Sequence, residues 1–135
     1  MGSRRLAAVG FAIVSAGVIG FQIALALGAP WGSYAVGGAF AGQFPPALRA
    51  AAVVQAVFIG LMAGVVLSRA GLALPRWSGV AGWLIWVVVA YGVVGLTLNL
   101  ITPSGGERMI WAPVTLLMLV FSSLVAFGGP GARRQ

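Results

Sequence analysis

Residues 99–113 read NLITPSGGERMIWAP, and they separate two long apolar runs of the chain. Glu107, within this stretch, is the only acidic residue of the protein. A polar segment between two apolar runs has to lie where a bilayer meets water, because lipid cannot satisfy its charge or its irregular backbone. The stretch therefore predicts a hairpin between two membrane-spanning helices.

The whole chain has the composition of a membrane protein. Of its 135 residues, 61% are hydrophobic and 7% are charged, and the mean hydropathy is +1.07. Soluble domains are about half apolar and about a quarter charged, and a chain this short cannot bury so much apolar surface within itself. We therefore expect a single transmembrane domain over residues 1–135.

Four apolar runs are long enough to cross a bilayer as helices, which takes about 20 residues. They cover residues 6–28, 46–69, 78–100 and 108–128. The sequence thus predicts an all-α, four-helix bundle within the membrane. The first run follows Arg4 and Arg5 as in a signal peptide, but its length favours a retained span over a cleaved one.

The arginines predict the orientation of the bundle. An N-terminus in the cytoplasm puts six arginines on the inner face (Arg4, Arg5, Arg69, Arg76, Arg133 and Arg134) and two on the outer face (Arg49 and Arg108). Because cytoplasmic segments are enriched in basic residues, we expect both termini inside and two hairpins outside. The richness in Ala, Gly, Val and Arg without Lys suggests a GC-rich bacterium, and hence a bacterial inner membrane.

Small residues recur at every fourth position of the first two runs. The first run has Ala8, Ala12, Ala16, Gly20, Ala24 and Gly28, and the second has Ala52, Ala56, Gly60, Gly64 and Ser68. Such stripes let two helix backbones approach closely. We expect the first two spans to pack together, with dimerisation as the alternative use of the same groove.

The first outer connection, residues 29–45, is uncharged and rich in glycine and aromatic residues. A solvated loop of this length is normally polar. We expect it to lie in the membrane interface, with Trp31 and Tyr34 at head-group level. The alternative is a cap or short re-entrant segment over the bundle, which requires protein partners for its backbone groups.

The uncommon polar side chains gather in the outer half of the predicted bundle. Seven are candidate ligand-binding residues: Gln22, Tyr34, Arg49, Gln55, Asn99, Glu107 and Arg108. Amides in a membrane need hydrogen-bond partners, and for the two glutamines the structural alternative is a bond between helices. We interpret the cluster as an outward-facing site for a lipid, a small amphiphile or a partner protein.

Glu107 also has a structural interpretation. The spacing of Ser104 and Glu107 matches a capping box, in which each side chain bonds the backbone N–H of the other residue. We expect Glu107 to be exposed, with an ion pair to Arg49 as an addition to the cap. Pro113 is expected to kink the last span.

Several classes of function are excluded by what the chain lacks. It contains no Cys and no His, which leaves no thiolate or imidazole chemistry and no metal site. No predicted span holds a central carboxylate for proton-coupled export, and the scattered arginines suit lipid head groups better than nucleic acid. We assign no catalytic residue and no cofactor, and expect membrane lipids, a second copy or a partner membrane protein as contacts.

Two alternative functions stay open. A small homo-oligomeric transporter or channel would require a polar path across the whole bilayer. A lipid-modifying membrane enzyme would use Glu107 as its base.

The chain resembles a family of small four-span membrane proteins of high-GC bacteria over nearly its whole length. The resemblance rests on Gly28-Ala-Pro-Trp-Gly32, Gly37-Gly38, Pro46, Arg49, Arg69-Ala-Gly71, Asn99, Thr102-Pro-Ser104, Glu107-Arg108 and Trp111-Ala-Pro113. It implies the four-helix architecture and a joint role for both outer loops. It implies no particular activity or ligand.

Overall fold

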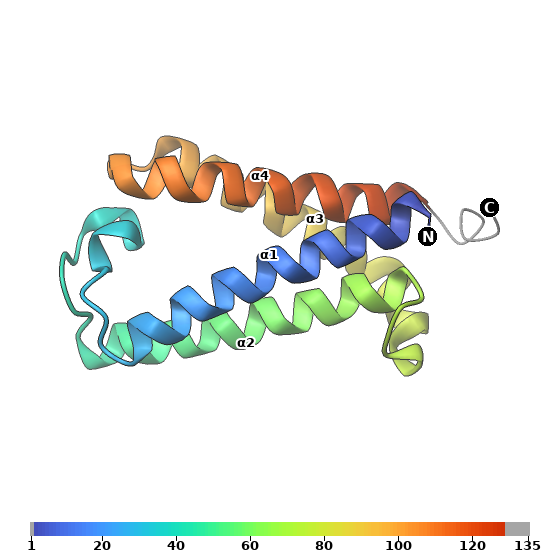
Figure 1. Cartoon of the computed structure of the whole chain (residues 1–135), viewed down its shortest axis with the longest axis horizontal. Helices are drawn as coiled ribbons and strands as arrows, with labels where there is room; N and C mark the ends of the chain where they lie inside the picture. Colours follow the sequence, from blue (N-terminus) through green and yellow to red (C-terminus); the bar gives the residue numbers. More distant parts are fainter. Residues whose placement is uncertain (1, 129–135) are drawn as a thin grey trace.

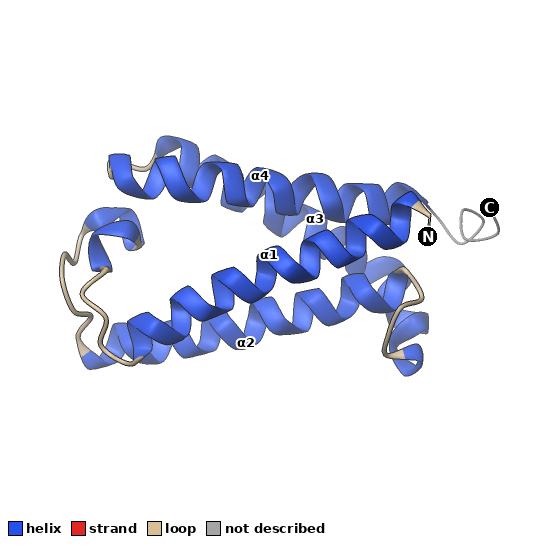
Figure 2. Ribbon diagram, viewed as in Figure 1, coloured by secondary structure: helices blue, strands red, loops and turns tan. Residues whose placement is uncertain are grey.

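The computed structural model describes residues 2–128, which form four long helices and three short 3-10 helices (Figures 1 and 2). The long helices are α1 (Ser3–Ala26), α2 (Pro46–Arg69), α3 (Ser78–Ile101) and α4 (Gly105–Gly128). The short ones are η1 (Gly32–Tyr34), η2 (Val36–Gly38) and η3 (Pro75–Trp77). Each long helix is long and apolar enough to cross a membrane. The predicted all-α, four-helix membrane bundle is confirmed for these residues.

The helix ends follow local chemistry. Helix α2 begins at Pro46, where a missing N–H costs nothing. It ends before Gly71, whose φ of 78° suits glycine. Helix α4 begins at Gly105, earlier than its apolar run, because the Ser104 hydroxyl accepts the Glu107 N–H at 3.1 Å.

The bundle has two distinct ends. We call the end with the α1–α2 and α3–α4 connections the hairpin end, and the end with residues 2 and 128 and η3 the terminus end. Helix α1 packs most extensively on α2, and α3 on α4. Figure 1 shows α1 beside α4 at the terminus end and diverging from it toward the hairpin end.

A glycine explains the close approach of α1 and α4. A Cβ on Gly10 would lie 2.8 Å from the Phe121 ring, so the ring of α4 sits directly on the α1 backbone. Toward the hairpin end, Phe21 and Trp111 stand between the same two helices, with ring centroids 4.6 Å apart. Large side chains there hold the helices apart.

The apolar core fills the middle and the terminus half of the bundle. Its fully buried members come from all four helices: Phe11, Val66, Ile85 and Val125. Outside the core, Trp83 and Trp86 of α3 are exposed, and Trp86 packs edge-on against Phe127 of α4. These surfaces face lipid once the bundle lies in a membrane.

The two small-residue stripes differ in how far they are buried. On α2 the stripe is largely buried, as Ala52, Ala56 and Gly64 show. On α1 it turns outward, so that Gly20 is exposed and a Cβ added there would touch nothing within 4 Å. A four-residue repeat drifts by about 40° per step around a helix of 3.6 residues per turn. The expected α1–α2 packing is present, but the α1 stripe is fully buried only at its start, at Ala8.

Helix α4 continues through Pro113 without a break. The Thr115 hydroxyl donates to the Trp111 carbonyl at 2.7 Å one turn earlier. This bond lies beside the position where the proline removes a backbone donor.

Candidate ligand-binding site

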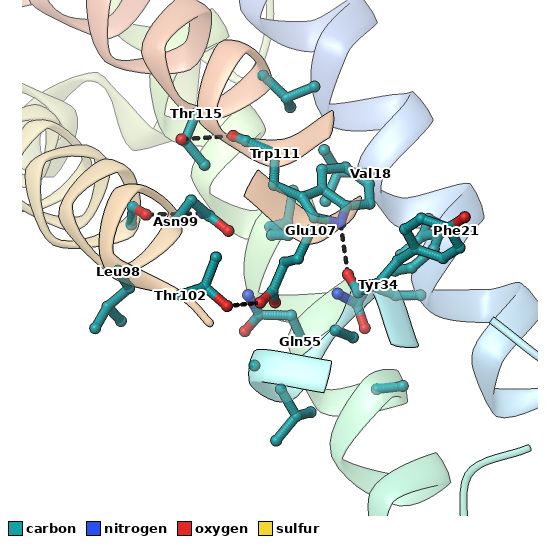
Figure 3. Close-up of a pocket in the computed structure, with 18 of the residues that line it drawn as sticks. Val18, Phe21, Tyr34, Gln55, Leu98, Asn99, Thr102, Glu107, Trp111 and Thr115 are labelled. Carbon is teal, nitrogen blue, oxygen red and sulfur yellow. Dashed lines mark hydrogen bonds between the residues drawn. The ribbon is translucent and has the colours of Figure 1, made fainter. Parts of the chain in front are cut away.

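A cavity of about 680 Å³ lies in the hairpin half of the bundle (Figure 3). All four long helices and the η1–η2 segment contribute to its wall. Small residues such as Ala51, Ala52 and Gly95 face it, and they leave space that the diverging helices do not fill. Most of the other lining side chains are aliphatic or aromatic.

The α1–α2 connection closes the hairpin end of this cavity. The Trp111 indole N–H donates to the Tyr34 carbonyl at 2.7 Å, and the Ser104 hydroxyl donates to the Ser33 carbonyl at 2.8 Å. Tyr34, Ala35 and Val36 of this connection line the cavity. The backbone carbonyls of Ser33 and Tyr34 thus find partners on and beside α4, which is what the cap, the alternative to an interfacial loop, requires.

The cap has a tight internal closure. The Gly32 N–H donates to the Gly42 carbonyl at 2.9 Å. A Cβ on Gly32 would lie 1.8 Å from the Phe40 carbonyl oxygen, so only glycine fits here. Trp31, next to it, stacks on Phe21 of α1. The cap is a folded unit held to the bundle at both sides.

Glu107 is buried, with 9% of its surface exposed, and its predicted exposure is wrong. The Thr102 hydroxyl donates to Glu107 Oε1. Figure 3 shows this bond across the turn between α3 and α4. The carboxylate lines the cavity and does not reach back to Ser104.

Only half of the predicted capping box forms. Ser104 accepts the Glu107 N–H, as the spacing indicates. The reciprocal bond is missing because Thr102 Oγ1 accepts the Ser104 N–H at 3.3 Å in place of Glu107. Thr102 thus satisfies the turn and frees the carboxylate for the cavity.

The two glutamines do not bond each other. Gln55 Nε2 donates to the Tyr91 hydroxyl of α3. Gln22 makes no side-chain hydrogen bond with any residue in the range 2–128. Both line the cavity. Gln55 therefore joins helices, as its structural interpretation holds, whereas the Gln22 amide is left to the cavity.

Arg49 and Arg108 lie outside the cavity lining. Arg49 Nε donates to the Phe44 carbonyl at 2.8 Å, and Arg108 Nη2 donates to the Thr102 carbonyl at 2.8 Å. Both arginines therefore hold the backbone of the connections between helices. The expected ion pair between Arg49 and Glu107 does not form. Among the described residues, Glu107 is the only charged side chain on the cavity wall.

Five of the seven candidate residues come together on this wall: Gln22, Tyr34, Gln55, Asn99 and Glu107. Sequence reasoning missed Tyr91, Thr102, Trp111 and Thr115 as lining residues. The spacing on α3 is a signal that points to Tyr91 as a lining residue. Tyr91 lies eight residues before Asn99, which is about two turns earlier on a broad face of the helix. Asn99 Nδ2 itself donates to the Gly95 carbonyl on that face at 2.8 Å.

Exposed residues of the cavity wall point to an opening between α2 and α3, and the lining residues Tyr34 and Val36 of the cap are exposed as well. At the opening, Ala51 of α2 and Leu98 and Ile101 of α3 line the cavity and are also exposed. Below this opening, the Gln55–Tyr91 bond ties α2 to α3. In a membrane the opening faces lipid.

No protein-family model, curated protein or solved structure matches this chain. The fold and the site define a class, a multi-pass membrane protein with a capped apolar cavity. Its function has to be argued from that cavity.

Proposed function

We propose that the chain is a non-enzymatic membrane protein that binds a lipid chain or a small amphiphile in the capped cavity. The observation that carries this proposal is the cavity itself. Its volume of about 680 Å³ falls within the range of roughly 300–1,000 Å³ typical of small-molecule sites. Its wall is largely apolar with a few convergent polar groups, which is the pattern such sites have. A concave site suits a small ligand better than a partner protein.

The opening between α2 and α3 supports a ligand that reaches the site from the membrane. Leu98 and Ile101 at its edge are apolar, so they favour passage of an alkyl chain over passage of a hydrated solute. The cap lies over the hairpin end of the cavity and is held there by the bond from the Trp111 indole to the Tyr34 carbonyl.

The filled terminus half favours binding over transport by a single copy. A second cavity, beside Phe11, Met62 and Val88, measures about 30 Å³. Such a space holds at most about one or two waters, and its neighbours belong to the apolar core. A channel would need a path through this region, so a homo-oligomeric transporter remains the alternative.

The enzyme alternative stays a prediction. It requires that Glu107→Gln abolishes conversion of a lipid without lowering thermal stability.

We also propose that the hairpin end faces the outside of a bacterial inner membrane, with both termini in the cytoplasm. Arg4, Arg5, Arg69 and Arg76 lie at the terminus end and support this orientation. Arg133 and Arg134, which also entered the prediction, lie outside the described residues. Membership of the small four-span family rests on the resemblance alone and is part of this proposal.

The test of binding uses a decyl alcohol with a bromine at the end of its chain. Bromine quenches tryptophan on contact, and Trp111 lines the cavity. The protein is reconstituted in nanodiscs of an uncharged galactolipid. We expect a saturable component of quenching that disappears in Trp111→Phe, above the linear component caused by partition into lipid.

Two alanines of α2 provide a matched pair of variants. Ala51 lines the opening, whereas its neighbour Ala50 is exposed and does not. Ala51→Phe is expected to reduce saturable quenching at least about tenfold, because its ring occupies the opening, and Ala50→Phe is expected to leave it unchanged. Equal effects of the two variants, or no saturable component, would refute the proposal.

A further inference from the structure

Resting on the proposed function, we propose that the ligand carries a protonated amine, which binds the carboxylate of Glu107 while its apolar body occupies the cavity. The inference concerns the head group alone. It follows from the charge of the wall, from the hydrogen bonds already made there and from the aromatic residues around it.

The first step is the charge of the wall. Glu107 is nine-tenths buried and, within residues 2–128, is the only charged group that lines the cavity. Its Oε1 accepts from Thr102, and among the described residues nothing donates to Oε2. A buried carboxylate without a cation is unfavourable, and a charge-assisted bond to an ammonium group removes much of that cost. Glu107 Oε2 therefore favours a cationic donor over a neutral one.

The arginines at this end of the bundle do not supply that donor. The guanidinium of Arg49 lies against Gly28, with Nε on the Phe44 carbonyl. Arg108 is exposed, with Nη2 on the Thr102 carbonyl. An anionic head group in the cavity would meet Glu107 and no lining cation, so it would be repelled.

The second step is the count of donors and acceptors. Three donors on the wall are already used within the protein: the Thr102 hydroxyl on Glu107, the Asn99 amide on Gly95, and the Trp111 indole on Tyr34. The side-chain carbonyl oxygens of Asn99 and Gln55 remain as acceptors, in addition to Glu107 Oε2. The wall also keeps donors, such as the Gln22 amide and the Tyr91 hydroxyl. Its charged acceptor is Glu107, and a primary ammonium group, which donates three hydrogen bonds, satisfies that carboxylate and leaves two donors for neutral acceptors.

The third step is the aromatic content of the wall. Phe21, Tyr34, Tyr91 and Trp111 come from three helices and the cap, and all line the cavity. Aromatic faces attract ammonium groups, most strongly where water is excluded. The same rings accept an alkyl chain, so the wall suits both parts of one amphiphile.

A primary ammonium group on an apolar body has two sources in a membrane. One is a free long-chain amine, and the other is the head group of an ethanolamine phospholipid, whose phosphate would have to stay at the opening because the described residues of the cavity wall offer it no cation. Glu107 recognises the same group in both, so the experiment has an arm for each.

The experiment compares three probes with the same brominated decyl chain and different head groups: an alcohol, an ammonium and a sulfate. Saturable quenching of Trp111 is measured in galactolipid nanodiscs, which contain neither amines nor phosphates. We expect the ammonium probe to bind at least about tenfold more tightly than the alcohol, and the sulfate more weakly than the alcohol. Glu107→Gln, which retains an acceptor for Thr102, is expected to abolish the preference for the ammonium probe over the alcohol.

The outcomes separate the two proposals. Saturable alcohol binding without an ammonium preference, or a preference that survives Glu107→Gln, would overturn this inference and leave the proposed function standing. Absence of saturable binding by all three probes would overturn both. The ranking of the three probes in the unaltered protein is decisive even where Glu107→Gln does not fold.

A final arm adds an ethanolamine phospholipid to the nanodiscs. Competition with the ammonium probe would support the lipid head group as the source of the amine. Undiminished probe binding would support a free amine. Both results agree with recognition of ammonium by Glu107.

Discussion

At the residue scale, the direction of the Glu107 side chain depends on two hydroxyls in the turn between α3 and α4. Ser104 accepts the Glu107 N–H and starts the helix. Thr102 accepts the Ser104 N–H and donates to the Glu107 carboxylate. Thr102 thereby takes the place of Glu107 in the turn before α4, and its hydroxyl holds the Glu107 carboxylate toward the cavity. The one acid of the chain therefore faces the cavity.

Replacement of Thr102 tests this arrangement. Thr102→Val keeps the shape but leaves the buried carboxylate and the Ser104 N–H without their partner, so we expect a loss of about 1–3 kcal/mol in the free energy of unfolding. Thr102→Ser keeps the hydroxyl and is expected to lose much less. Equilibrium unfolding in detergent measures both. A loss for Thr102→Ser that exceeds the loss for Thr102→Val would show that the methyl group matters more than the hydroxyl.

Spacing alone predicted part of this turn. The Ser104 cap follows from its distance to Glu107 in the sequence. The direction of the carboxylate does not, because Thr102 and Glu107 compete for one N–H and the outcome depends on the path of the turn. The Arg49–Glu107 ion pair was predicted wrongly for a similar reason. Arg49 instead donates to the carbonyl of Phe44, which lies five residues earlier in the chain.

At the element scale, the cap between α1 and α2 decides whether the cavity is closed. Its attachments to α4 are made by the backbone carbonyls of Ser33 and Tyr34. Every residue type has such a carbonyl, so the sequence cannot show where these bonds form. The four long helices, in contrast, were predictable because their length and hydrophobicity are set by the bilayer.

Gly32 provides the test of the cap. Gly32→Ala would drive a Cβ to within 1.8 Å of the Phe40 carbonyl, so we expect the closure to open at a cost of about 1–3 kcal/mol. Hydrogen exchange should then accelerate across residues 31–42. Gly20→Ala is the control, because α1 is open around Gly20 and alanine stabilises a helix by about 1 kcal/mol relative to glycine. Unchanged exchange in Gly32→Ala would mean that the cap is not closed as described.

At the scale of the whole molecule, the cavity results from a difference between the two ends of the bundle. Gly10 admits Phe121 at the terminus end, whereas Phe21 and Trp111 separate α1 and α4 at the hairpin end. Spans and membrane class could be predicted from composition. The divergence could not, because it depends on which glycine meets which ring across helices that are distant in the sequence.

Orientation in the membrane is tested at the same scale. The chain contains no cysteine, so a single introduced cysteine reports one position. Gln43→Cys lies in the cap and Ala73→Cys in the α2–α3 connection, and both positions are exposed. With a maleimide that does not cross membranes, we expect labelling of Gln43→Cys in intact cells and of Ala73→Cys only after lysis. The reverse pattern would contradict the proposed orientation.

The most direct measurement is a crystal structure of the protein with the brominated ammonium probe, recorded at the bromine absorption edge. We expect one bromine peak inside the bundle, within the cavity lined by Leu98 and Trp111, and the probe's nitrogen beside Glu107. Bromine found only on lipid-facing surfaces, or on an axis between copies of the chain, would contradict binding in the cavity.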